Sequence, residues 1–254
     1  MTSPLEVAVF SPGSALLAQS QGAGRIELNA PGSYASGGTT PPLDVFNLLS
    51  SQMSIPIRVM IRPRGPPQDG SPDFLYAEDE FAGMKEAIDS FVNSGSLNLS
   101  RGDGFVFGIL KRGNDGVQVD VERCYELTKL CHPFPCVFHR AFDPIAATSN
   151  WSAGLSALET AGFRGLLTSG GLGNMGDNLP RLGEIADKAR QKIELVAGGG
   201  LRAQTFGPEV AELLARHEDH VWLHTAALAR GDDGEATEQV DPKELGALLA
   251  KLKA

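Results

Sequence analysis

The feature of this sequence that most constrains its fold is a regular alternation of eight short apolar runs with eight longer amphipathic stretches. Val, Ile, Leu and Phe dominate the runs, and Gly, Pro or polar residues bound them. Continuous apolar runs of this kind are typical of strands that are buried on both faces of a parallel sheet. The predicted strands are Leu5–Phe10, Arg25–Asn29, Ile57–Ile61, Gly104–Leu110, Cys136–His139, Gly165–Thr168, Ile193–Ala197 and His220–His224.

The amphipathic stretches carry apolar residues at helical spacing, so each predicted strand is followed by a predicted helix. The first helix shows clear start and stop signals, because Ser11 can cap it, Pro12 suits its first turn and Gly22 can end it. The predicted helices are Ser11–Gly22, Leu43–Gln52, Ala77–Asn93, Asp120–Leu130, Trp151–Ala161, Asn178–Arg190, Thr205–Arg216 and Pro242–Lys253.

Eight strand–helix units are the number that closes a (β/α)8 TIM barrel, which is an α/β fold. The chain has 254 residues and no linker long enough to divide it, so we expect a single barrel domain over residues 1–254. A doubly wound open sheet is the alternative architecture, and it would carry a glycine-rich phosphate-binding turn after the first strand. Here the first predicted strand runs into the segment SPGS, which is not such a turn.

The composition limits the partners and the compartment of the protein. With 22 basic and 31 acidic residues the formal net charge is −9, which disfavours general binding to nucleic acid or to anionic membranes. No apolar run approaches the roughly 20 residues of a membrane span, and the N-terminus lacks the basic segment of a secretory signal. Three cysteines in a chain of this length do not indicate a disulfide framework. We therefore expect a cytoplasmic protein that could also enter the nucleus. The acidic run 231–241 is predicted to be a solvated loop.

Polar residues gather where the predicted strands end, which is where TIM barrels carry their active sites. Charged groups that interrupt buried apolar runs are costly unless they are paired or functional. The catalytic candidates are Glu27, His139 and Asp143. The candidates for substrate binding are Arg62, Arg64, Arg140, Thr168, Ser169, Gly198, Gly199, Gly200 and His224.

These residue types allow several kinds of chemistry at one barrel mouth. Arg62 can bind an anion as a bidentate fork, and Glu27 with His139 can act as a general acid–base pair. Glu27, His139 and His224 can also hold a divalent metal ion, because carboxylate and imidazole suit zinc and copper(II). The alternative is an ion-pair network that only closes the top of the barrel. Glu6 lies near the start of its strand, so we expect it either to be buried more deeply or to face a helix.

A glycine-rich turn follows the seventh predicted strand. Backbone N–H groups in the loops after the last strands of a barrel often bind phosphate, and glycine allows a close approach of the ligand. Gly198–Gly200, with the hydroxyl groups of Thr168 and Ser169, could bind a small anionic ligand in this way. The alternative is a tight turn whose dihedral angles alone require glycine.

The cysteines do not form a metal-binding motif. Cys124 and Cys131 lie seven residues apart on one predicted helix, which is about two turns and too far for one ion. Cys136 opens the fifth predicted strand, at the end away from the mouth. We interpret all three as small buried hydrophobic residues rather than copper ligands, and the metal ligands stay unassigned.

Several segments together resemble the CutC family of copper homeostasis proteins. They are LEVAVFSPGSALLAQSQGAGRIELNA, SGGTTPPL, IRVMIRPRGP, VFHRAFD, LLTSGG and VAGGGLR, in order from the first strand to the seventh. The resemblance implies a cytoplasmic TIM barrel that is linked to copper tolerance, is proposed to bind copper(I) and forms dimers or larger homo-oligomers. The functional residues that the resemblance implies most directly are Glu27, Arg62, Arg64, His139, Arg140 and Asp143.

The chain departs from the family at one informative position. Members commonly have a cysteine after the glutamate of the second strand, where this chain has Asn29. Asparagine offers no thiolate, so the resemblance supplies no soft copper(I) ligand at this place.

Three functional hypotheses remain open. The first is a CutC-like protein of copper homeostasis, with copper as a possible cofactor that the sequence does not require. The second is a TIM-barrel lyase or isomerase for a small anionic or phosphorylated metabolite. In that enzyme Arg62 and Arg64 would hold the anion, and Glu27 or His139 would move the proton. The third is a non-catalytic oligomeric barrel that binds a partner.

Overall fold

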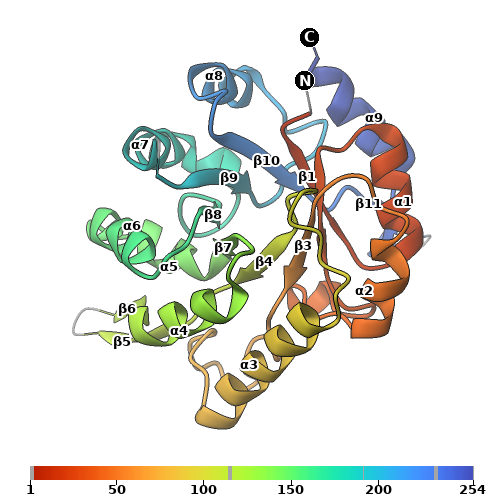
Figure 1. Cartoon of the computed structure of the whole chain (residues 1–254). Coiled ribbons are helices and arrows are strands. Elements are labelled where there is room, and N and C mark those ends of the chain that lie inside the picture. Colours follow the sequence, from red (N-terminus) through yellow and green to blue (C-terminus); the bar gives the residue numbers. More distant parts are fainter. Residues whose placement is uncertain (1–2, 114–115, 191, 232–233, 254) are drawn as a thin grey trace.

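The computed structural model describes residues 3–113, 116–190, 192–231 and 234–253. Eight parallel strands close into a barrel in the order β1–β10–β9–β8–β7–β4–β3–β2, and helices surround them (Figure 1). The predicted TIM barrel is therefore confirmed. Its strands are β1 (Leu5–Val9), β2 (Arg25–Leu28), β3 (Ile57–Met60), β4 (Gly104–Phe107), β7 (Cys136–Phe138), β8 (Gly165–Thr168), β9 (Glu194–Gly198) and β10 (Val221–Thr225).

The helices follow the barrel strands as the sequence predicts, with short extra turns in the loops. The capping signals of the first helix are confirmed, because the Ser11 hydroxyl accepts the Ser14 N–H and Gly22 has a φ of 101°. The α-helices are α1 (Pro12–Gln21), α2 (Leu43–Ser50), α3 (Glu78–Asn93), α4 (Val121–Cys131), α5 (Asp143–Ala146), α6 (Trp151–Thr160), α7 (Leu179–Ala189), α8 (Pro208–Arg216) and α9 (Pro242–Lys251). Three 3-10 helices are described, η1 (Tyr34–Ser36), η2 (Arg140–Phe142) and η3 (Met175–Asn178).

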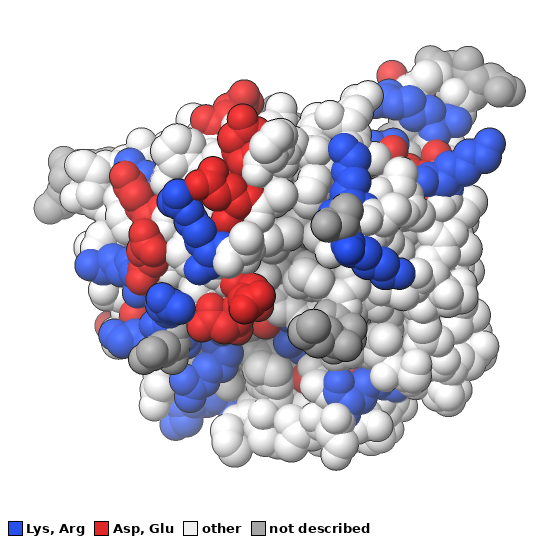
Figure 2. Space-filling view, turned by 90° about the horizontal axis from the view of Figure 1, so that it is seen from above, with Lys and Arg blue, Asp and Glu red and all other residues white. Residues whose placement is uncertain are grey.

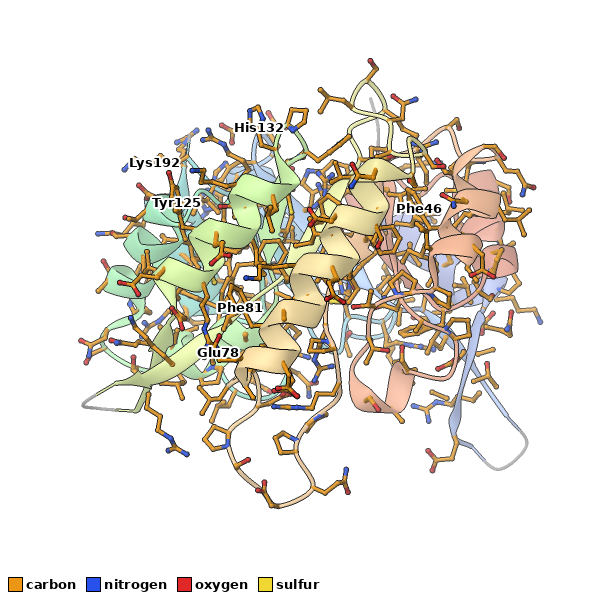
Figure 3. All side chains as sticks on the ribbon, turned by 60° about the horizontal axis from the view of Figure 1, so that its bottom comes forward. Phe46, Glu78, Phe81, Tyr125, His132 and Lys192 are labelled. Atoms are coloured by element: carbon orange, nitrogen blue, oxygen red, sulfur yellow. The ribbon has the colours of Figure 1, made fainter. Side chains whose placement is uncertain are left out.

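Two antiparallel hairpins were not predicted from the sequence. The apolar run 104–110 is not one strand, because β4 ends at Phe107 and Leu110 begins a hairpin of β5 (Leu110–Gly113) and β6 (Gly116–Val119). The acidic run predicted to be a loop contains β12 (Ala236–Val240), which pairs with β11 (Leu228–Arg230). Both hairpins and the long loop between β3 and α3 project from the same end of the barrel (Figure 3). This end is the mouth, because the barrel strands run toward it.

The hydrophobic core has two layers. The larger layer lies between the barrel and its helices, and Figure 3 shows α3 and α4 side by side with Phe81 between them. The smaller layer fills part of the barrel with Met60, Val106, Val137, Leu167 and Val196, against which Trp222 packs. A third, small apolar cluster consists of Ala8, Phe10 and Leu228 near the mouth. The interior also contains buried charged side chains, which is unusual for a filled barrel and draws attention to strands β1, β2 and β10.

One face of the molecule carries charges of both signs. On the side of the molecule shown in Figure 2, basic and acidic side chains lie interspersed, and large areas carry neither. Within the described ranges, no helix combines the length and apolar character needed to cross a membrane.

Asp103 ties together the start of β3 and the loop that enters β4. Its fully buried carboxylate accepts hydrogen bonds from the Ile57 and Asn98 N–H groups and from the Arg101 guanidinium. We predict that Asp103→Asn lowers the free energy of unfolding by about 3–5 kcal/mol, because it leaves the Arg101 charge without its partner. Urea unfolding measures the change. The exposed Asp79→Asn serves as the control and should stay within about 0.5 kcal/mol of the wild type. Equal stability of the two variants would contradict the role given to Asp103.

Candidate functional site

Two buried carboxylates and a largely buried imidazole meet inside the barrel. Glu6 on β1, Glu27 on β2 and His224 on β10 come from neighbouring strands, and alternate residues of each strand point inward. The His224 Nε2 atom lies 3.8 Å from Glu6 Oε1 and 3.7 Å from Glu27 Oε1. One ligand atom from each residue lies within 4.8 Å of the others. We call Glu6, Glu27 and His224 the interior triad.

Side chains outside the triad form hydrogen bonds to the two carboxylates of the triad. The Arg25 guanidinium donates to Glu6 Oε2 at 2.5 Å and to Glu194 Oε1 at 2.5 Å, and it stacks 4.0 Å from the Trp222 ring. The Asn29 amide donates to Glu27 Oε1 at 3.1 Å. Arg25 and Glu27 therefore both point into the barrel, as the alternation of β2 predicts.

The pKa values of Glu27 and His224 are shifted toward their charged forms in spite of burial. Burial is the largest single cause, and alone it would raise the pKa of Glu27 and lower that of His224, because it disfavours a charged group. For Glu27 the nearby His224, Asn29 and Arg25 together outweigh burial, and the pKa is lowered. For His224 the carboxylates of Glu27 and Glu6 together outweigh burial, and the pKa is raised. Both shifts favour an ion pair between Glu27 and a protonated His224.

A cavity of about 250 Å³ opens above the triad at the barrel mouth. Among the candidates from the sequence, it is lined by Glu27, Arg62, His139, Arg140, Gly199, Gly200 and His224. Gly198, Thr168, Ser169, Asp143 and Arg64 do not line it. The candidate residues thus divide into a group that can touch a ligand and a group that supports the mouth from behind.

His139 lies in the cavity wall but not in the triad. Burial and the nearby Arg62 charge lower the pKa of His139 to about 3, so its imidazole is neutral at pH 7. Its Nδ1 atom accepts the Ala141 N–H at 3.3 Å. The metal-binding set expected from the sequence is therefore changed, because Glu6 takes the place beside Glu27 and His224 that had been expected for His139.

Arg62 and Arg64 are largely engaged by the protein itself. The two terminal nitrogens of Arg62 donate to the carbonyl groups of Ser36 and Gly38 and to Asp73. Arg64 pairs with Glu80 and Asp73, away from the cavity. The fork of Arg62 thus has its acceptors within the chain, and no ion pair joins Arg62 to Glu27 in the described residues.

Asp143 organises the loops around Arg140. Its carboxylate accepts the Thr168 hydroxyl at 2.6 Å, the Ser169 N–H at 2.9 Å and hydroxyl at 2.9 Å, and the Arg140 Nε–H at 2.8 Å. Thr168 and Ser169 are fully buried. These contacts support a positioning role for Asp143, while the catalytic role expected from its sequence position stays a prediction.

Sequence reasoning missed Arg202 and the rings of Phe10, Tyr34 and Phe74 in the cavity wall, and it did not connect Glu6 with His224. Arg202 lines the mouth after the glycine-rich turn, and the arginine that ends the segment VAGGGLR was its only signal. Glu6 was recognised as a buried charge, but a single sequence does not show that it lies opposite His224 in the β1–β10 register.

The three cysteines lie outside this site. Cys124, Cys131 and Cys136 are free, buried in the layer between barrel and helices, and absent from the cavity wall. Burial raises the pKa of the Cys124 thiol to about 12 and that of Cys131 well above its usual range. These thiols are thus protonated at neutral pH, which makes them poor metal ligands as they stand.

The comparisons with known proteins agree on one family. The family model described as CutC family matches residues 3–224. The mouse copper homeostasis protein cutC homolog is 40% identical over 197 residues, which are 78% of this chain and 65% of the mouse protein. The human homolog is 38% identical with the same coverage, so the chain spans just under two thirds of both mammalian relatives. The family protein CutC of Treponema denticola is 31% identical over 90% of this chain and 83% of that protein.

The solved structure of a CutC protein from Streptococcus agalactiae has the same architecture. It is 26% identical, with a TM-score of 0.69, over 87% of this chain and 97% of that chain. An aldolase at 14% identity and a TM-score of 0.56 shares the fold alone.

The ion pair between Glu27 and His224 predicts a defined pH dependence. The raised pKa of His224 stabilises the fold below about pH 6.5 and this contribution is lost as pH rises through its folded value. The lowered pKa of Glu27 stabilises the fold above about pH 4.5 and this contribution is lost as pH falls. Glu27→Gln should therefore destabilise the protein most between these two pH values.

Urea unfolding of wild type and Glu27→Gln across the pH range measures this dependence. NMR titration of His224 gives a second readout, with a midpoint above 6.5 that falls in the variant. A His224 midpoint that is unchanged by Glu27→Gln would show that the pair does not interact as described.

Proposed function

The chain belongs to the CutC family, and we propose that it serves in copper homeostasis, the role that names its mouse and human relatives, by binding copper(II) at the interior triad. The observation that carries this proposal is the convergence of Glu6, Glu27 and His224, with His224 Nε2 buried and without a hydrogen-bond partner in the described residues. A buried polar atom in this condition is costly unless a ligand satisfies it.

The spacing of the triad suits a metal ion. Atoms that share an ion through bonds of about 2.0–2.2 Å are themselves roughly 3–4 Å apart. The two distances from His224 Nε2, 3.8 and 3.7 Å, fall in that range. Arg25 on Glu6 and Asn29 on Glu27 supply the outer hydrogen bonds that usually orient metal-binding carboxylates.

The donor set favours copper(II) over copper(I). Two carboxylates and one imidazole are harder ligands than the thiolates that select copper(I). The thiols of this chain lie elsewhere, and Asn29 stands where family members commonly carry a cysteine. Copper would replace the proton of His224, so binding should weaken as pH falls.

The compartment and the assembly are part of this proposal. We place the protein in the cytoplasm, as the resemblance to its family implies, where the triad would have to bind copper(II) before cytoplasmic reductants convert it to copper(I). The homo-oligomer implied by the family resemblance stays a prediction. The enzyme hypothesis gains no support from Arg62 and Arg64, whose guanidinium groups have acceptors within the chain.

We predict that the wild-type protein binds one copper(II) ion at neutral pH, and that Glu27→Gln and His224→Asn each weaken binding by at least about 100-fold, because each removes a ligand. Isothermal titration calorimetry with copper(II) measures the affinity. The control is His132→Asn, which removes an exposed imidazole of the kind that binds copper adventitiously. Binding at wild-type affinity in both triad variants, or binding that depends on a cysteine instead, would contradict the proposal.

A further inference from the structure

The cavity above the triad has two unlike walls, and copper binding gives neither of them a role. One wall follows β7 and β9 and presents polar donors: Arg140, Gly199, Gly200 and Arg202. The facing side follows β1, β2 and β3. It carries Glu27, Asn29 and Arg62, and it also carries the rings of Phe10, Tyr34 and Phe74, which we call the apolar wall. The strand order places β1 opposite β7 and β3 opposite β9, so the two walls face each other.

Arg140 is the best-held cation of the donor wall. Asp143 accepts its Nε–H at 2.8 Å, and the Ser169 hydroxyl and the Gly173 carbonyl accept from Nη2 at 3.2 and 3.1 Å. Its Nη1 group has no acceptor in the described part of the chain, and the side chain is 45% exposed. The guanidinium is thus fixed in place with one end free for an anion.

The glycine turn brings backbone donors beside Arg140. Gly199 and Gly200 have φ values of 110° and 76°, which favour glycine, and a Cβ atom on Gly199 would lie 3.3 Å from Arg140 Cζ. Neither N–H group donates to an acceptor among the residues that the structure describes. Free N–H groups in left-handed turns form anion-binding concavities.

The apolar wall sets the character of the ligand. Phe10 and Tyr34 pack edge to face at 5.5 Å, and Phe74 lies under the Arg62 guanidinium. A simple inorganic anion would leave this wall without a contact. The cavity of about 250 Å³ is also smaller than the roughly 300–1,000 Å³ of typical pockets for drug-sized molecules.

We propose that the barrel mouth binds a small organic carboxylate, with its carboxylate on Arg140 and the Gly199–Gly200 turn and its apolar body against Phe10, Tyr34 and Phe74. The proposal goes beyond copper binding and does not depend on it, because the carboxylate-binding groups are not the triad carboxylates. The tests use metal-free protein, so their outcome does not depend on whether copper binds to the triad.

Benzoate, acetate and benzyl alcohol separate the two contributions, because they carry the charge and the ring together or one at a time. We expect benzoate to bind at least about tenfold more tightly than either of the others. Arg140→Met should weaken benzoate binding about tenfold without changing that of benzyl alcohol. Arg140→Lys should weaken benzoate binding less than Arg140→Met does, because it keeps the charge but loses the fixed guanidinium. Calorimetric titration of the metal-free protein measures each pair.

Arg164→Met, an exposed arginine at the opposite end of the barrel, is the matched control. Gly199→Ala is a second variant that crowds the Arg140 guanidinium and should also weaken benzoate, so the test stands even if Arg140→Met does not fold. Equal binding of benzyl alcohol and benzoate, or benzoate binding unaffected by both mouth variants, would overturn the proposal. Tighter binding of inorganic phosphate than of benzoate would overturn the assignment to an organic acid.

Discussion

The charged interior of this barrel depends on Arg25. Its guanidinium is buried and bonds Glu6 on β1 and Glu194 on β9, while Trp222 on β10 covers it. A buried charge that loses its partner is strongly destabilising, so the four strands must place these groups together. Burial would lower the pKa of Arg25, but the two carboxylates outweigh it and the pKa is raised. One oxygen of Glu6 is thereby fixed, and the other is left to face His224.

The mouth therefore has three layers along the barrel axis, and each layer has its own chemistry. Deepest is the Arg25 network, which sets the position of Glu6. Above it lie Glu27 and His224, whose opposite charges keep a proton where a metal ion could replace it. Nearest to solvent is the cavity with its donor wall and apolar wall.

The sequence was sufficient for the barrel because each strand is buried on both faces and reads as an apolar run. It was insufficient for the hairpins, since β5–β6 and β11–β12 consist of short half-exposed segments without that signal. It identified Glu27 and His224, but the third member of the triad follows from the register of β1 with β10. Likewise, the acceptors that occupy Arg62 come from the loop before α2 and from Asp73, which only the folded chain brings near.

We propose that copper binds to oxygen and nitrogen at the interior triad and not to sulfur. X-ray absorption at the copper edge, on protein loaded with one equivalent of copper(II), tests this proposal. We expect a first shell of oxygen and nitrogen atoms only, with the outer scattering of one imidazole that is lost in His224→Asn. A first shell that contains sulfur would contradict the proposal and would point to a cysteine or to Met60, which lines the cavity.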